Sequence, residues 1–321
     1  MRRRLKVISK YLNILTSPTM AKHEVLSPGV SDKDVNIDAL EVVYKSDNFL
    51  CVNKNFDVKI NSNNPNDVTV EHQVRKLFPH LVDPKCTHGF RFVHRLDYAT
   101  SGILCLALNK RAAGHLSAMF KAQQVTKYYL ALVRGHVHNE STLIDIAIGP
   151  LVDQEWPGRM CAVDHPHCSE PRPTKTLLMC LERGTYDGQP ATKVLLKPFT
   201  GRQHQLRVHC DYIGHTIVGD YTYSNRRDTT PERMMLHSYK LQAQTTIENL
   251  DLQTSDPFVP DLVKPWQPVE VVRPSDEALK LAQNFDFNTC NDQSVGGGLD
   301  IKHVTLNPDK TCCHSNINVC T

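Results

Sequence analysis

The stretch of sequence that decides the fold is Phe92-Val93-His94-Arg95-Leu96-Asp97, then Tyr98-Ala99-Thr100-Ser101-Gly102, then Ile103-Leu104-Cys105-Leu106-Ala107-Leu108. The first part predicts a strand over 92–96 that stops at Asp97. The last part is almost unbroken in apolar residues, which is typical of a central strand. The small and polar residues between them predict a loop. An acid therefore stands where one strand gives way to a loop, just before a buried strand.

Signals for further strands and helices extend on both sides of this stretch. Upstream we predict strands at 42–44 and 49–52 around a turn, and a helix at 70–78 capped by Thr69. Downstream, Asn109 caps a helix, and a strand follows at 127–133. Later predictions are a loop or hairpin insertion at 150–173, strands at 176–181 and 191–196, a helix just after Thr200-Gly201 that stops at Gly214, and a strand from 234. Strands outnumber helices without strict alternation. The fold class is therefore α+β, with a mainly antiparallel sheet, and not a doubly wound α/β fold.

Three regions are expected along the 321 residues. Residues 1–38 form a basic N-terminal extension, 39–275 a globular domain, and 276–321 a polar, flexible C-terminal tail. The extension carries Leu5, Ile8, Leu12 and Leu15 on one helical stripe. It is compatible with a mitochondrial presequence or with a basic arm that touches RNA.

The composition indicates an intracellular protein that does not span a membrane. No apolar run approaches the roughly 20 residues that a bilayer requires. The 11 cysteines are odd in number and irregularly spaced, which argues for a reducing compartment. We expect cytoplasm or nucleus, with the mitochondrion as the alternative that the N-terminal extension leaves open.

The net charge is only +3, but it is unevenly distributed. The segment 85–137 holds eight Lys or Arg and one acid, Asp97, for a net +7. The segment 193–215 holds four bases and one acid, for a net +3. Two interpretations fit these basic segments. Either they line one surface that binds a polyanion, or they are solvated basic surfaces without a partner.

Asp97 is the one acid of the basic segment 85–137, and it stands at the end of a predicted strand. A carboxylate at a strand end, surrounded by basic, polar and glycine residues, can serve as a nucleophile or a general base. It can also merely cap the following turn. A glycoside hydrolase would need a second carboxylate facing it, and the sequence does not place one.

Two further segments carry polar chemistry. Gly201-Arg202-Gln203-His204-Gln205-Leu206-Arg207-Val208-His209 crowds two Arg, two His and two Gln around a helix start. We expect Arg202 and His204 in the first turn, where free backbone N–H groups favour phosphate, and Arg207 one turn deeper. In Lys127-Tyr128-Tyr129, adjacent tyrosines on a strand point to opposite faces, so one of them is free to stack on a base.

No cofactor or metal site is predicted. Cysteines and histidines gather at 161–168 and at 312–320, but neither group has the paired spacing of a structural zinc site. The sequence also lacks the GxGxxG and P-loop phosphate motifs.

Together these segments closely resemble the RluA-type pseudouridine synthases. His94-Arg95-Leu96-Asp97 with Thr100-Ser101-Gly102 is similar to that family's catalytic motif, and Lys127 to Val133 to its tyrosine strand. Thr200 to His209, Val218-Gly219-Asp220 and Leu236-His237-Ser238 are similar to its later motifs. The resemblance covers about residues 39–275. One motif departs: Lys-Pro-x-Gly is replaced by Lys54-Asn55-Phe56-Asp57, which removes a rigid turn.

The resemblance implies a pseudouridine synthase fold: an α+β domain with a long mixed, mostly antiparallel sheet, flanking helices and a central catalytic cleft. It implies isomerisation of uridine to pseudouridine in tRNA, rRNA or mRNA, by a monomer without cofactor or metal. Asp97 would be the nucleophile or base, held ionised by Arg207, with Tyr129 stacked on the flipped uracil. The remaining substrate-binding residues would be Arg95, which helps extrude the base or fills its vacated place, Leu206, which packs beside the base, and Arg202, His204 and Lys127.

Overall fold

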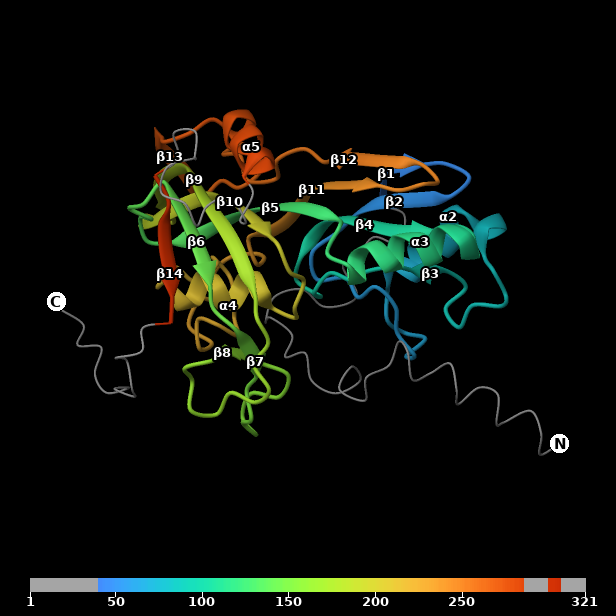
Figure 1. Ribbon diagram of the computed structural model, residues 1–321, viewed down its shortest axis with the longest axis horizontal. Coiled ribbons are helices and arrows are strands. Elements are labelled where there is room, and N and C mark those ends of the chain that lie inside the picture. The colour runs from blue at the N-terminus through green and yellow to red at the C-terminus, as the bar shows by residue number, and fades with distance from the viewer. Residues whose placement is uncertain (1–39, 286–299, 307–321) are drawn as a thin grey trace.

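The computed structural model describes residues 40–285 and 300–306. Its main feature is a sheet of 12 strands, shown in Figure 1. The path across the sheet is β1 (Glu41–Lys45), β2 (Phe49–Lys54), β4 (Ser101–Ala107), β11 (Leu236–Gln244), β5 (Thr126–Arg134), β10 (Gln189–Pro198), β9 (Lys175–Tyr186), β6 (Ser141–Asp145) and β14 (Lys302–Thr305). Off this path, β3 (Arg91–Phe92) pairs with β4, β12 (Asn249–Gln253) with β11, and β13 (Trp266–Val271) with β9.

Pairing in this sheet is mostly antiparallel, as expected. The parallel pairs among the described strands are β4 with β11 and β6 with β14. β7 (Ile148–Pro150) and β8 (Met160–Ala162) form a separate two-stranded sheet. β7 ends where the predicted insertion at 150–173 begins and β8 lies inside it, so the insertion contains one strand of a hairpin and is otherwise irregular. The α+β class with a mixed, mainly antiparallel sheet is confirmed.

Helices cover both faces of the sheet because apolar side chains alternate along its strands. On β5, Leu130 and Leu132 face a cluster that includes α5 (Ser275–Asn284), whereas Ala131 and Val133 face one that includes α4 (Gln205–Tyr212). In the other half of the sheet, α3 (Lys110–Lys121) and α2 (Val70–Leu77) pack on opposite faces in the same way. A short 3-10 helix, Pro79–Leu81, follows α2.

The two helix caps predicted from sequence are present. Thr69 Oγ1 accepts the His72 N–H at 3.2 Å, and Asn109 Oδ1 accepts the Ala112 N–H at 2.9 Å. None of the described helices is both long and apolar enough to cross a bilayer.

Three sequence predictions need correction. The strand expected over 92–96 is only the two-residue β3, because His94 turns away from it: its Nε2 accepts the Cys105 N–H at 2.9 Å and its ring stacks on Phe120. Arg202 and His204 precede α4 instead of forming its first turn. The flexible tail expected from residue 276 is wrong over α5, which buries Ala278 and Leu279 in the core, and over β14. The rest of that tail and the extension at 1–38 lie outside the described residues.

Candidate active site

Asp97 lies where the two halves of the sheet meet. Leu96 is buried in the cluster beneath α2, while Ala99 packs against the cluster beneath α4. The Thr100 N–H donates to the Asp97 carbonyl at 3.1 Å, which closes a turn. Two anchored neighbours thus fix the loop, and the Asp97 side chain keeps 17% of its surface exposed.

The altered motif at 54–57 supports this same loop. Lys54 is fully buried, and its Nζ donates to the carbonyls of Tyr98, Val58 and Asn55 at 2.8–2.9 Å. Asp57 has φ +52°, a left-handed conformation that Asp tolerates better than most residues. The tight turn therefore survives the loss of the family's Pro and Gly, and Lys54 secures the residue that follows Asp97.

The loop before α4 is shaped by a buried glutamine. Gln205 Oε1 accepts from the Thr200 hydroxyl at 2.7 Å and from the Arg202 N–H at 3.1 Å. His204 has φ +54° and therefore reverses the chain into the helix. This reversal leaves Arg202 exposed on the outside and directs Arg207 inward.

Arg207 is the buried cation of the site. Its Nε and Nη2 donate to the two oxygens of Asp220 at 2.7 and 2.9 Å, and its Nη1 lies 3.5 Å from Asp97 Oδ2. Its guanidinium carbon lies 5.0 Å from the centre of the Tyr223 ring. Burial opposes the charged form, but the two carboxylates outweigh it, and the pKa of Arg207 is raised. Arg207 is thus held firmly by Asp220 and presents one remaining N–H edge to Asp97.

His204 forms the other wall beside Asp97. Its Nε2 lies 3.8 Å from Asp97 Oδ2 and has no hydrogen-bond partner, while its Nδ1 lies 3.2 Å from the Tyr223 hydroxyl. Burial, followed by the nearby Arg207 charge, lowers the pKa of His204 to about 4. The imidazole is therefore neutral near pH 7.

The electrostatic environment keeps Asp97 ionised. Burial alone raises its pKa, but His204, Arg207 and Arg95 together lower it below the usual value. Because His204 is neutral near pH 7, the lasting positive charge comes from the two arginines. A carboxylate in this setting is available as a nucleophile or base throughout the neutral range.

Tyr129 and Lys127 share the face of β5 that borders this loop. Tyr128 is fully buried on the opposite face, whereas Tyr129 is half-buried against both the α2 and the α4 clusters. Burial, and more weakly the Asp97 charge, raise the pKa of Tyr129 to about 12, despite a hydrogen bond with Ser238. Burial lowers the pKa of Lys127 to about 8, and its Nζ lies 5.9 Å from the centre of the Phe120 ring.

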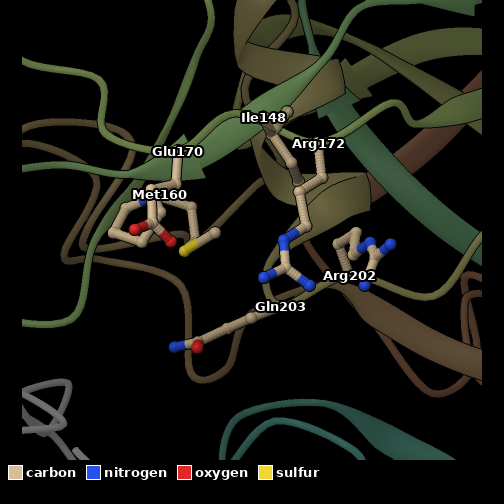
Figure 2. A pocket seen from close by; sticks show the side chains of 7 residues that line it. Ile148, Met160, Glu170, Arg172, Arg202 and Gln203 are labelled. Atoms are coloured by element: carbon tan, nitrogen blue, oxygen red, sulfur yellow. The ribbon is translucent and has the colours of Figure 1, made fainter.

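The structure brings most of the predicted site residues together. Leu206 is buried in the cluster against which Tyr129 and Ala99 pack. Arg95 is exposed but close enough to act on the charge of Asp97. Arg202 is exposed and lines the hollow shown in Figure 2.

Asp220 and Tyr223 are parts of the site to which sequence reasoning assigned no role. The signal in the sequence was Val218-Gly219-Asp220, which is similar to a motif of the family but lies in a loop without periodicity. No group of three or more His, Cys, Asp or Glu within 40–285 and 300–306 is arranged to hold a metal ion. The Cys and His residues at 312–320 lie outside those ranges.

Comparisons with known proteins identify the family of this chain. The model of the family "RNA pseudouridylate synthase" matches residues 41–212, which includes Asp97, Tyr129 and Arg207. The chain belongs to the RNA pseudouridylate synthase family.

Relatives of this pseudouridine synthase extend the match beyond the family model. RNA pseudouridylate synthase domain-containing protein 1 of Danio rerio is 48% identical over 246 residues, which is 76% of this chain and 84% of that protein. The human protein of the same name is 45% identical over 248 residues, or 76% and 80% of the two chains. The dual-specificity RNA pseudouridine synthase RluA of Vibrio parahaemolyticus is 42% identical over 155 residues, or 46% and 58%.

A solved structure of human RNA pseudouridylate synthase domain containing 1 superposes with a TM-score of 0.71 at 43% identity, covering 78% of this chain and 97% of that one. The resemblance to pseudouridine synthases stated from the motifs is confirmed. The enzyme is an isomerase that acts on uridine in RNA.

Proposed function

We propose that this enzyme isomerises uridine in structured RNA with Asp97 as its catalytic nucleophile or base. The observation that carries the proposal is the arrangement around that carboxylate: Arg207 lies 3.5 Å away and is itself locked by Asp220, and Tyr129 borders the same loop. Such an arrangement holds a charged carboxylate in one position before the substrate arrives.

The reaction requires only a rearrangement within one nucleotide. The bond from uracil N1 to ribose C1′ breaks, the freed uracil turns, and a bond forms from C5 to C1′ while the C5 proton leaves and N1 gains one. Asp97 initiates the cleavage, and no second substrate or electron donor is needed to balance the atoms.

The other residues act as contacts for a flipped nucleotide. Tyr129 stacks on the uracil, Leu206 packs beside it, and Arg95 fills the place that the base leaves. Arg202 and Lys127 meet the RNA backbone. His204, predicted from sequence to face phosphate, is buried beside Asp97, so we assign its free Nε2 to the flipped nucleotide instead. All of these groups come from one chain, so a monomer suffices.

A glycoside hydrolase would need a second free carboxylate. The other carboxylate of this centre, among the residues that the structure describes, is Asp220. Both of its oxygens are bound by Arg207. Isomerisation therefore accounts for the site better than hydrolysis does.

The proposal is tested by incubating wild-type protein and an Asp97→Asn variant with cellular RNA and mapping new pseudouridines at nucleotide resolution. We expect modified sites only with wild type, and their positions will show whether tRNA, rRNA or mRNA is the target. Asp261→Asn, which makes the same change at a fully exposed side chain, should retain activity. Equal modification by wild type and Asp97→Asn would contradict the role of Asp97.

A further inference from the structure

A small hollow opens beside the active site, between the β7–β8 hairpin and the loop before α4 (Figure 2). Its volume is about 240 Å³, which is smaller than most sites for whole cofactors. The chain that forms its rim is tied to β7, because Arg172 and Ile148 exchange backbone hydrogen bonds of 2.9 and 3.1 Å. The lining residues are Ile148, Pro150, Met160, Glu170, Arg172, Arg202 and Gln203.

The charged side chains that line this hollow do not contribute ion pairs or hydrogen bonds to the described part of the fold. Arg172, Arg202 and Glu170 are exposed, and their side chains make no ion pair or hydrogen bond within the described ranges. By contrast, Arg134 and Arg183 elsewhere on the surface are each held by a carboxylate. Unpaired guanidinium groups on a rigid rim are suited to binding an anion.

The hollow also has an apolar side. Ile148 is buried, and the half-buried Met160 lines the same space. A ligand that matches it therefore has an anionic group, a flat apolar face and a polar edge. A nucleotide of single-stranded or looped RNA has all three.

Contacts connect the hollow to the catalytic centre. The Tyr223 hydroxyl accepts from the Met160 N–H and donates toward the Met160 carbonyl, both at 3.1 Å. The same hydroxyl lies 3.2 Å from His204 Nδ1, and His204 Nε2 lies 3.8 Å from Asp97. Tyr223 and His204 thus connect Met160 to the carboxylate through two side chains, and we place a nucleotide in the hollow near the one at Asp97 in the RNA strand.

We propose that this hollow binds one nucleotide flanking the target uridine and that it prefers guanine. Arg172 and Arg202 bind the phosphate, and the Glu170 carboxylate accepts hydrogen bonds from guanine N1–H and N2–H. Guanine presents two adjacent N–H donors on that edge, which neither uracil, cytosine nor adenine does. The inference rests on the proposed function, because it identifies the hollow as part of an RNA site.

The test uses RNA hairpins whose loop holds one uridine among adenosines, with guanosine introduced at each neighbouring position in turn. Binding of the full-length Asp97→Asn variant is measured by fluorescence anisotropy, so no turnover is needed. We expect one guanosine position to tighten binding about tenfold, the lower range for a bidentate base contact. Adding Glu170→Gln should remove this preference, so that the guanosine hairpins and the all-adenosine hairpin bind equally.

Two matched controls accompany this test. Glu155→Gln makes the same charge change at an exposed residue of the same insertion and should keep the guanosine preference. Arg172→Gln should weaken every hairpin and reduce the salt dependence by about one phosphate contact. Lys280→Gln, on α5 at the opposite face of the sheet, should do neither.

Equal binding of all hairpins, or none, would overturn the proposal, as would a preference that survives Glu170→Gln or is also lost in Glu155→Gln. A guanosine preference without any pseudouridine formation by wild type would instead contradict the proposed function alone, because the binding assay does not depend on Asp97 chemistry.

Discussion

At the scale of single residues, Arg207 contacts two carboxylates unequally. Asp220 receives two short hydrogen bonds, whereas Asp97 lies at the 3.5 Å limit of one. Asp220 therefore determines where the guanidinium sits, and Asp97 keeps an oxygen free for chemistry. The side chain of Asp220 is fully buried, so the pair has no solvent to replace a lost partner.

This inequality predicts the effect of Asp220→Asn. The change leaves a buried guanidinium without its main counter-charge, so we expect a loss of about 3 kcal/mol in the free energy of unfolding. Arg207 then shifts toward Asp97, and pseudouridine formation should fall at least tenfold. Urea unfolding and an RNA modification assay measure the two effects. Glu140→Gln removes an arginine partner that is 57% exposed, and should cost less than about 1 kcal/mol; an equal loss in both variants would contradict the prediction.

Residue types drew attention to Asp97, to the polar helix start that contains Arg207 and to the pair Tyr128-Tyr129, because a lone acid in a basic segment and a crowd of polar groups are visible in the sequence. The resemblance to a known family then assigned the roles of Asp97, Arg207 and Tyr129. Asp220 and Tyr223 received no role because their loop has no periodicity and their contacts form only in three dimensions. His204 was expected in the first turn of the helix, facing phosphate, since the left-handed backbone that turns it inward cannot be seen in the sequence.

At the scale of elements, the junction of β4 and β11 supports the loop that follows Asp97. Gly102 has φ +110°, and a Cβ there would lie 2.3 Å from the Ser238 carbonyl oxygen. Both the backbone conformation and the close approach of β11 therefore require glycine. Ser238 is also the hydrogen-bond partner of Tyr129, so this junction connects the sheet to the site.

We therefore expect Gly102→Ala to lower the free energy of unfolding by more than about 2 kcal/mol, because left-handed strain and steric overlap add to each other. Gly114→Ala provides the matched control: Gly114 lies within α3, and a Cβ there meets no atom within 4 Å. It should stabilise the protein by about 0.5–1 kcal/mol. Chemical denaturation of both variants measures the difference, and a harmless Gly102→Ala would show that the two strands can separate at little cost.

Elements were predicted well where local sequence decides them. The helix caps at Thr69 and Asn109 and the central strand β4 were predicted correctly, since capping residues and an unbroken apolar run are visible in the sequence. The length of β3 was overestimated because the Cys105 N–H donates its hydrogen bond to the His94 side chain and not to a backbone carbonyl of a longer strand. Helix α5 was missed because its apolar residues are few, and its docking on the opposite face of the sheet depends on distant strands.

At the scale of the whole molecule, three buried histidines make stability depend on pH. His204, His209 and His237 are at most 8% exposed, and burial lowers their pKa values to about 4, 4 and 3. Their ordinary value is about 6.5. Below that pH these histidines bind protons in the unfolded chain but stay neutral in the folded protein. The stability that these residues contribute is thus complete above about pH 6.5 and is lost as the pH falls toward the folded values.

Between pH 7 and pH 5 each histidine should therefore cost about 2 kcal/mol of unfolding free energy, or roughly 6 kcal/mol together. Urea unfolding at the two pH values measures this loss. His209→Gln should reduce the pH-dependent loss by about one third, because Gln does not titrate, even though the variant has a lower stability at pH 7. His138→Gln, at an exposed histidine, should leave the loss unchanged. If His209→Gln and wild type lose the same free energy between the two pH values, buried neutral histidines are not what makes this sheet sensitive to acid.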